Sequence, residues 1–391
     1  MITLHNTTEF AKKAGMYLGI GLGVIIMITI FFKVGKTINA MLNPPKIPPP
    51  NEAYGKLPPL TFPQSTVRGQ FTYTINTTSG SLPQGFPDRL IIYPTVISQP
   101  NLLNLDNTKS KVASLGFVDN SGNTVAEIPR GGANYEWDEL GGFQRKIVFD
   151  IVSQNFTMTS NYLTALSVGQ AQYIQQLTNP TDAIPIVQNF LGTISSMPSD
   201  IDMNLTQNPD PNNAYTTSPQ LFTISQGGQL VPTTSLSSAQ VIRVDLYQGA
   251  VSYTLTAGLN QDPTQFQDFN MSLPIVYPHP PYSTMNFLVA SGDSEADIVS
   301  AIFNHQTVNL QPSTQATYPI KSAQEAFDEL KSGKGYIAAY NGTESQIQIS
   351  NVFPAYYLGN TQQQYLMPII VFQGQDGFFA YVPAVTSDSL Q

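Results

Sequence analysis

Residues suited to acid–base chemistry are scarce in this chain of 391 residues, which has three histidines and no cysteine. His305 is the best placed, because it follows a segment, 295–303, whose apolar pattern predicts a short helix. A histidine at the carboxyl end of a helix is favoured by the helix dipole, which is a sufficient structural reason for it. Pairing of His305 or His279 with Ser291 or Asp293 would instead indicate a hydrolase with a dispersed site.

Cofactor and metal chemistry find little support in the sequence. The absence of cysteine excludes disulfides, thiolate nucleophiles and Cys-ligated metals. No phosphate-binding glycine loop, nucleophile elbow or HExxH motif occurs. The run DNSGN, residues 119–123, offers oxygen ligands to a cation but lacks the spacing and the acidic closing residue of a calcium loop, and a β-turn, which needs no ion, is favoured. We expect no enzyme, with no catalytic residue, no cofactor and no metal site.

Three residues suit recognition of a ligand at the surface. Trp137 stands between Glu136 and Asp138 on a predicted strand, where its ring is either a platform for a sugar or a buried strand residue. His279 and Tyr282 fall in YPHPPY, an extended loop made rigid by its prolines. Trp137, His279 and Tyr282 are therefore the candidates for a surface that binds a glycan or a peptide.

The elements that would position these residues alternate between helix and strand. Ser322 and Glu325 form a capping box at the start of a helix, and further helices are predicted at 106–115 and 182–194. Each helix is accompanied by short segments of alternating apolar residues that predict strands. The clearest predicted strands are 71–75, 89–93, 145–151, 240–247, 251–256, 336–340, 346–352, 365–372 and 378–382. This pattern predicts an α+β body of tandem helix-plus-antiparallel-sheet units.

An uncharged apolar run, residues 14–32, lies near the N-terminus between pairs of lysines. A helix of this length covers the roughly 30 Å hydrocarbon core of a bilayer. The run ends in Phe31, Phe32 and Lys33 without a small-residue cleavage site, so a retained transmembrane helix is favoured over a signal peptide. Gly15, Gly19 and Gly23 would share one face of this helix, a spacing that either permits close helix pairing or reflects the general abundance of glycine in membrane helices.

A proline-rich segment, from Pro44 to Pro63, follows the apolar run. Proline at this density favours an extended polyproline II conformation, which predicts a spacer between the bilayer and the body. The predicted organisation is a short cytoplasmic tail (1–13), a transmembrane helix (14–32), a Pro-rich linker (33–65) and three α+β units (66–175, 176–310 and 311–391).

The distribution of charged residues along the chain indicates on which side of the membrane the body lies. Charged residues make up 11% of the chain, against roughly 25% in ordinary soluble domains, and a net charge of −9 excludes a nucleic-acid partner. From Ile147 to Ile320 the one basic residue is Arg243, a composition that suits an extracytoplasmic space. Lysines on the body side of the span favour the opposite orientation, but long domains cross membranes largely regardless of charge. We expect a single-pass protein of the cell membrane with its large C-terminal body extracytoplasmic.

Several sequence runs resemble known proteins. SAQEAFDELKSGKGYIA, followed by VFPAYYLG, YLMPIIVFQG and GFFAYVPAV, resembles the carboxyl-terminal region of uncharacterised single-span, Pro-stalked envelope proteins of candidate-phyla-radiation bacteria. AYGKLPPLTFP, KVASLGFVDNSGN and YEWDE are similar to the linker and first unit of the same group. The helix with its AYY and PIIVF strands also looks like the PepSY-like units of membrane-anchored regulators of the Gram-positive cell-wall sensor kinase. The resemblance implies a bacterial envelope protein and no particular activity.

Together these patterns favour a membrane-anchored extracytoplasmic protein that acts by protein–protein interaction, as a structural or regulatory component of the envelope without catalysis. Its partner would be another protein or a second copy paired through the transmembrane helix. A cell-surface module that binds glycan or peptide is the alternative, and a hydrolase with a dispersed site is the third.

Overall fold

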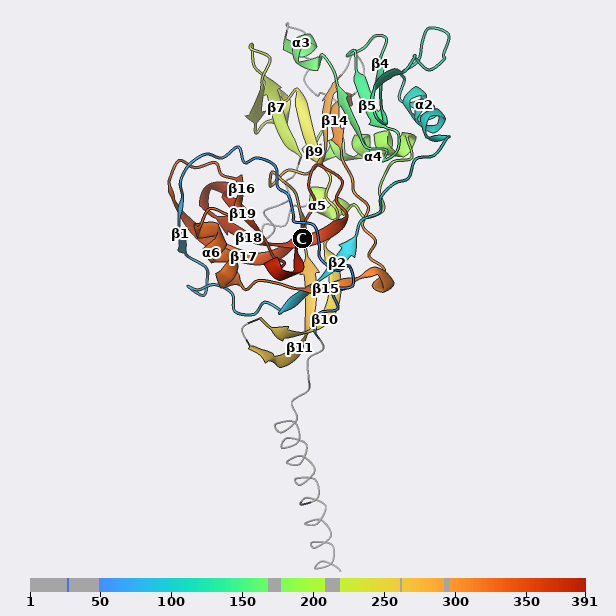
Figure 1. Cartoon of the computed structure of the whole chain (residues 1–391). Helices are drawn as coiled ribbons and strands as arrows, with labels where there is room; N and C mark the ends of the chain where they lie inside the picture. The colour runs from blue at the N-terminus through green and yellow to red at the C-terminus, as the bar shows by residue number, and fades with distance from the viewer. Residues whose placement is uncertain (1–26, 28–48, 168–176, 208–218, 261, 292–295) are drawn as a thin grey trace, which may run out of the picture.

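The computed structural model has two sheet-rich halves, one above the other in Figure 1. It describes residues 27, 49–167, 177–207, 219–260, 262–291 and 296–391. The predicted tail (1–13) and transmembrane helix (14–32), with Gly15, Gly19 and Gly23, lie outside these ranges except for Met27. Within the described ranges, every helix is too short or too polar to cross a bilayer.

The lower half is built on a mixed eight-stranded sheet. β17 lies beside β1 and β12 in parallel and beside β18 antiparallel. Strands from the two ends of the body thus meet, since Thr72 pairs with Gln346. The strands are β1 (Thr72–Ile75), β2 (Arg89–Pro94), β12 (Ile275–Val276), β15 (Ala316–Pro319), β16 (Tyr336–Ala339), β17 (Gln346–Tyr357), β18 (Tyr365–Gly374) and β19 (Phe379–Pro383).

The upper half is built on an antiparallel nine-stranded sheet in the order β3-β4-β5-β6-β14-β13-β9-β7-β8. Strands β13 and β14 pair with each other at the centre of this sheet. β13 also pairs with β9, and β14 also pairs with β6. The strands are β3 (Ile128–Gly131), β4 (Asn134–Asp138), β5 (Lys146–Asp150), β6 (Phe156–Thr159), β7 (Gln220–Ile224), β8 (Leu230–Thr233), β9 (Val241–Asp245), β13 (Met285–Ser291) and β14 (Ala296–Phe303).

Helices and one long hairpin complete the two halves. Helix α4 packs against β9, β13 and β14 and covers the core face of the upper sheet, because Val187, Phe190 and Leu191 share one helix face and are buried. The helices are α2 (Asn104–Ser114), α3 (Tyr162–Ser167), α4 (Ala183–Thr193), α5 (Met203–Gln207) and α6 (Ala323–Lys331). The hairpin of β10 (Val251–Leu259) and β11 (Asp262–Leu273) lies at the lower end of the coloured body in Figure 1.

The fold-class prediction is wrong, because the body is mostly sheet and is not a row of helix-plus-sheet units. Each large sheet draws on strands from distant parts of the chain: the lower sheet uses segments near both ends of the body, while β13 and β14 return to the upper sheet after the hairpin has been formed below. Long-range pairing of this kind leaves no sequential unit with a complete sheet. The residue boundaries of the three units stay predictions.

The predicted helix at 295–303 is also wrong. Ala296–Phe303 forms β14, a central strand paired on both sides. Its buried residues Ile298 and Val299 are β-branched, a property that favours strands. His305 therefore follows a strand, and the helix-dipole explanation for it does not apply.

The described part of the proline-rich linker does not act as a free spacer. Leu57 is fully buried and its backbone bridges to Leu390 at the C-terminal end. Phe62 stacks on Tyr336 with ring centroids 5.0 Å apart. These contacts bind residues near 57–62 to the lower sheet, so this part of the predicted stalk belongs to the folded body.

Candidate functional site

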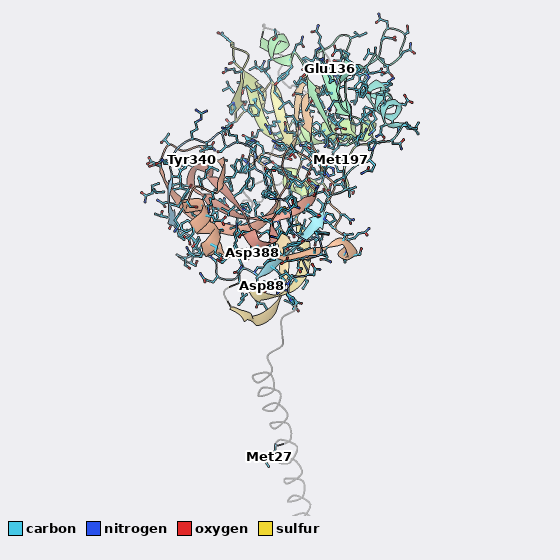
Figure 2. All side chains as sticks on the ribbon, in the orientation of Figure 1. Met27, Asp88, Glu136, Met197, Tyr340 and Asp388 are labelled. Atoms are coloured by element: carbon cyan, nitrogen blue, oxygen red, sulfur yellow. The ribbon has the colours of Figure 1, made fainter. Side chains whose placement is uncertain are left out.

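Two adjoining hollows lie at one end of the upper sheet, where it meets the lower half. Figure 2 places Met197, which lines one of them, at this junction. Strands β4 and β6 start here and strands β5 and β14 end here, because antiparallel pairing brings these strand ends to the same end of the sheet. Ser153, Asn155 and Phe303 line both hollows, so the two share a wall.

The first, which we name the amide hollow, has a floor made of Val148, Thr157 and Ile302. These residues pair in register across β5, β6 and β14 and therefore point to the same face of the sheet. Their strand neighbours, such as Phe156 and Phe303, are buried on the opposite face, where α4 packs. Ile302 remains 46% exposed, so the floor is an open, uncovered part of the sheet.

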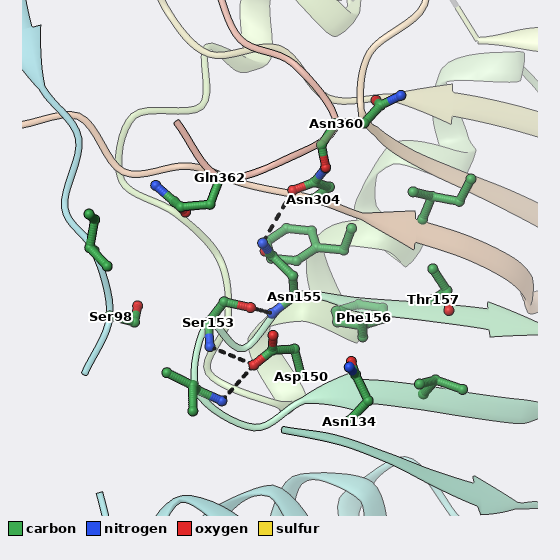
Figure 3. Close-up of a pocket in the computed structure, with 15 residues that line it drawn as sticks. Ser98, Asn134, Asp150, Ser153, Asn155, Phe156, Thr157, Asn304, Asn360 and Gln362 are labelled. Carbon is green, nitrogen blue, oxygen red and sulfur yellow. Dashed lines mark hydrogen bonds between the residues drawn. The ribbon is translucent and has the colours of Figure 1, made fainter. Parts of the chain in front are cut away.

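The wall of the amide hollow comes from elsewhere in the fold. Ile97 and Ser98 enter from the segment between β2 and α2, and Asn360 and Gln362 from the connection between β17 and β18 (Figure 3). The hollow has a volume of about 460 Å³. Asn134, Asn155 and Asn304 add further side-chain amides to its lining, which makes it a site rich in groups that both donate and accept hydrogen bonds.

A hydrogen-bonded turn between β5 and β6 forms the ridge between the hollows. The Asp150 carboxylate accepts from the backbone N–H groups of Val152 and Ser153 at 2.8 and 3.0 Å. Gln154 follows with a positive φ of 62°, a conformation that non-glycine residues adopt at an energetic cost and that often occurs at functional sites. Figure 3 shows Asp150 and Asn155 on this turn.

Asn155 clamps the ridge to the segment after β14. Its Oδ1 accepts from the His305 backbone N–H at 3.0 Å, and its Nδ2 donates to the His305 carbonyl and to Asn304 Oδ1, both at 3.2 Å. Asn304 Nδ2 in turn donates to the Asn360 carbonyl at 2.5 Å. The upper sheet is thereby joined through side-chain amides to the β17–β18 connection of the lower half.

Gln306 completes this connection from a buried position. Its Nε2 donates to the carbonyls of Gly359 and Thr361 at 2.9 and 3.0 Å, and its Oε1 accepts from the Gln363 N–H at 2.8 Å. Only 2% of the residue is exposed. Because a buried amide with satisfied hydrogen bonds fixes the groups it contacts, Gln306 positions the wall that carries Asn360 and Gln362.

The second, the lysine hollow, has a volume of about 410 Å³ and lies on the helix side of the ridge. Lys111 from the last turn of α2 donates through Nζ to Ser196 Oγ at 3.1 Å, just after α4. Burial lowers the pKa of the Lys111 ammonium. On another side of the hollow, His305 Nε2 lies 2.8 Å from Asp200 Oδ1.

Comparisons with known proteins do not identify the site. No family model and no curated protein matches the chain. Among solved structures it is similar to the crystal structure of an uncharacterized protein from Eubacterium rectale ATCC 33656, with 9% identity and a TM-score of 0.29 over 77% of this chain and 87% of that chain. A TM-score this low carries no argument about fold or function. The resemblance to PepSY-like units and to candidate-phyla proteins stays a prediction.

The structure places His305 beside a carboxylate other than the expected one. Its partner is Asp200, which follows α4 by a few residues. Asp293 lies outside the described residues, and only the backbone of Ser291 is described. Neither the predicted helix at 295–303 nor the predicted pairing with Ser291 or Asp293 places His305 in a hollow.

Trp137 is fully buried in the upper core, with its ring centroid 6.4 Å from that of Phe149. Its ring faces are not accessible to a ligand, so the prediction of Trp137 as a surface-binding residue is wrong. The reason is that its side chain points from strand β4 into the core. The alternative interpretation, a buried strand residue, describes its position.

His279 and Tyr282 lie together on one turn, away from both hollows. The Tyr282 N–H donates to the His279 carbonyl at 2.9 Å, and His279 is exposed. The Arg243 guanidinium covers one face of the Tyr282 ring at 4.2 Å from its centroid, while pairing with Asp245 at 2.8 Å. One face of this ring is therefore already occupied.

The 119–123 segment forms a tight turn. Asp119 Oδ1 accepts from the N–H groups of Ser121 and Asn123 at 2.8 and 3.0 Å, and Gly122 has a positive φ of 79°. These backbone hydrogen bonds lower the pKa of Asp119. The carboxylate shapes the turn, as the β-turn interpretation of this segment requires.

Proposed function

We propose that this chain is a membrane-anchored extracytoplasmic protein that acts by binding a partner protein, and that its amide hollow holds an extended, uncharged peptide segment of that partner. One observation carries the proposal: the hollow places several side-chain amides around an open sheet face with apolar side chains. A peptide presents alternating N–H donors and C=O acceptors. The amides of Asn155 and Asn304 hold the hollow together, so the groups of the described lining that would bind a peptide are the Asn360 amide and the amide oxygens of Asn134 and Gln362.

The charge of the lining supports an uncharged ligand. Of the described residues that line the amide hollow, Asp150 is the one with an ionisable side chain. Its carboxylate is already held by two backbone N–H groups of the ridge. A strongly charged ligand would find no compensating charge here, and burial of an unpaired charge is costly.

The apolar groups favour a peptide over a glycan. Ile97 and Ile302 are 50% and 46% exposed and flank the amides, so they offer contact to aliphatic side chains. The two aromatic rings of the lining, Phe156 and Phe303, are almost fully buried. Sugar rings usually pack on exposed aromatic faces, which this hollow lacks among its described residues.

The location rests on the sequence. The apolar run 14–32 is long enough for a membrane helix, and the body has very few basic residues. Protease shaving of intact cells tests this part of the proposal, since peptides from residues 68–391 should be released. Peptides released only after the membrane is opened, with an inside-out vesicle control, would contradict it.

The binding function is tested with two arrays, one of short uncharged peptides and one of glycans, probed with the purified chain. We expect peptides to be retained and Ile302→Arg to abolish that retention, because the new side chain would project a charge from the floor of the hollow. Val231→Arg is the matched control, since Val231 is 42% exposed on β8 of the same sheet and lines neither hollow.

Two results would contradict the proposal. Retention of glycans alone would assign the protein to the alternative class of glycan-binding modules. Equal loss of peptide binding in Ile302→Arg and Val231→Arg would show that the amide hollow is not where peptides bind.

A further inference from the structure

Lys111 differs from the other half-buried lysines of the described chain in its partner. Lys109, two residues earlier on α2, pairs with Glu127 at 2.8 Å, and Lys321 pairs with Glu329 at 2.9 Å. Lys111 instead donates to the neutral hydroxyl of Ser196, and no carboxylate of the described residues lies within 4.0 Å of its ammonium. A half-buried cation without a counter-ion is costly, which points to an anion that arrives from outside.

The surroundings of Lys111 leave it available. Its ammonium has three donors, and the structure shows one of them used, towards Ser196 Oγ. The nearby Asp200 is directed elsewhere, because both of its oxygens are engaged by His305 Nε2 and Gln248 Nε2. Burial lowers the pKa of Lys111 without an opposing contribution from a neighbouring carboxylate.

The hollow that holds Lys111 shares a wall with the amide hollow. Ser153, Asn155 and Phe303 line both, so a peptide that lies in the amide hollow and bends over this shared wall would bring its next residues to the lysine hollow. We propose that the lysine hollow binds a carboxylate of the bound peptide, with Lys111 as its counter-ion and Ser196 as a second donor. This inference rests on the proposed function and deepens it, because it makes the ligand a peptide that carries one carboxylate beyond its uncharged segment.

Two sources can supply that carboxylate, the end of a chain or an acidic side chain, and three probes separate them. The first is N-acetyl-trialanine as the free acid, the second is its C-terminal amide, and the third is an amidated N-acetyl peptide with one internal glutamate. Met197 lines the lysine hollow, so the resonance of its ¹³C-labelled methyl group in the full chain reports binding directly.

We expect the free acid to shift the Met197 methyl at concentrations at least tenfold lower than its amide, a difference of about 1.4 kcal/mol. A similar shift by the glutamate peptide would show that the hollow accepts a side-chain carboxylate as well as a chain end, and its failure would assign the hollow to a chain end. Lys111→Met, which keeps the aliphatic stem, should remove the difference between acid and amide. Lys111→Arg should retain it, and Lys109→Met is the matched control that leaves it unchanged.

The inference is overturned if the acid and its amide shift the methyl equally, if the carboxylate probes cause no shift, or if Lys111→Met preserves the preference for a carboxylate. Ile302→Arg separates this failure from failure of the proposed function. If Ile302→Arg weakens the binding of both the acid and the amide while Lys111→Met changes neither, the amide hollow binds peptides but the lysine hollow does not bind a carboxylate. If only Lys111→Met has an effect, the lysine hollow binds anions independently of the amide hollow.

Discussion

His305 and Asp200 are joined by a 2.8 Å contact between Nε2 and Oδ1 across 105 residues of sequence. The contact links the segment after α4 to the segment after β14, on the wall of the lysine hollow. Gln248 Nε2 donates to the second oxygen of the carboxylate at 2.8 Å. The pair therefore holds together three segments that the sequence separates widely.

This pair predicts a loss of stability in acid. Burial by itself raises the pKa of Asp200, but the hydrogen bond and charge of His305, with the hydrogen bond of Gln248, lower it below its ordinary value. A carboxyl whose pKa is depressed by folding stabilises the native state above its unfolded pKa of about 3.9, and this contribution is lost as the pH falls through the folded pKa. We expect Asp200→Asn to be about 1–2 kcal/mol less stable at pH near 6, a modest value because the carboxylate is partly exposed.

The free energy of unfolding of both proteins, measured in urea near pH 6 and near pH 3, tests this prediction. The wild-type chain should lose more stability between the two conditions than Asp200→Asn, because the variant has no carboxylate to protonate at this position. An identical loss in both proteins would show that Asp200 contributes nothing to the acid response.

Local signals in the sequence correctly predict several elements. Ser322 Oγ accepts from the Glu325 N–H and the Glu325 carboxylate accepts from the Ser322 N–H, so the predicted capping box starts α6. Alternating or β-branched runs coincide with strands such as β5 and β18. These elements depend on hydrogen bonds and side-chain periodicity within a few residues, which is the information that a single sequence carries.

The sheet topology and the site could not be predicted in this way. β1 pairs with β17 across more than two hundred residues, and no local pattern specifies that partner. The amides of Asn155, Asn304 and Asn360 come from three separate connections and follow no fixed spacing. The β-branched residues of 296–303 did offer a signal for a strand, and with it the cluster Asn304, His305 and Gln306 would have been placed at a strand end.

Gln306 gives a prediction about the joint between the two halves. Gln306→Leu leaves the Gly359 and Thr361 carbonyls and the Gln363 N–H without their partner. Since unpaired buried polar groups are costly, we expect a loss of about 2–4 kcal/mol in the free energy of unfolding. Chemical denaturation measures this value directly.

Gln311→Leu is the control for the same chemical change at an exposed position, where a shift within about 0.5 kcal/mol is expected. Peptide binding should also weaken in Gln306→Leu, because Asn360 and Gln362 lie on the segment that Gln306 holds. Unchanged stability in Gln306→Leu would mean that the observed hydrogen bonds do not fix this segment.

Trp137 predicts a spectroscopic result, because it is the one tryptophan of the chain and is fully buried. Its fluorescence should be poorly quenched by acrylamide in the native state and unaffected by oligosaccharides. Trp137→Ala should cost about 3–5 kcal/mol of stability through the cavity it leaves. Trp137→Phe should cost less, since the indole Nε1 has no hydrogen-bond partner to lose among the described residues. Saccharide-dependent quenching would restore Trp137 as a binding residue.

The glycines of the N-terminal apolar run predict how copies of the chain associate. Gly15, Gly19 and Gly23 recur every four residues, so on a membrane helix they would form one narrow face that lets a second helix approach closely. Gly19→Ile should abolish crosslinking of the chain in membranes, because the branched side chain would hold the two backbones apart. Gly21→Ile is the matched control, since position 21 falls on the opposite side of such a helix and should leave crosslinking intact. Equal crosslinking of the wild-type chain and Gly19→Ile would exclude this face as the interface.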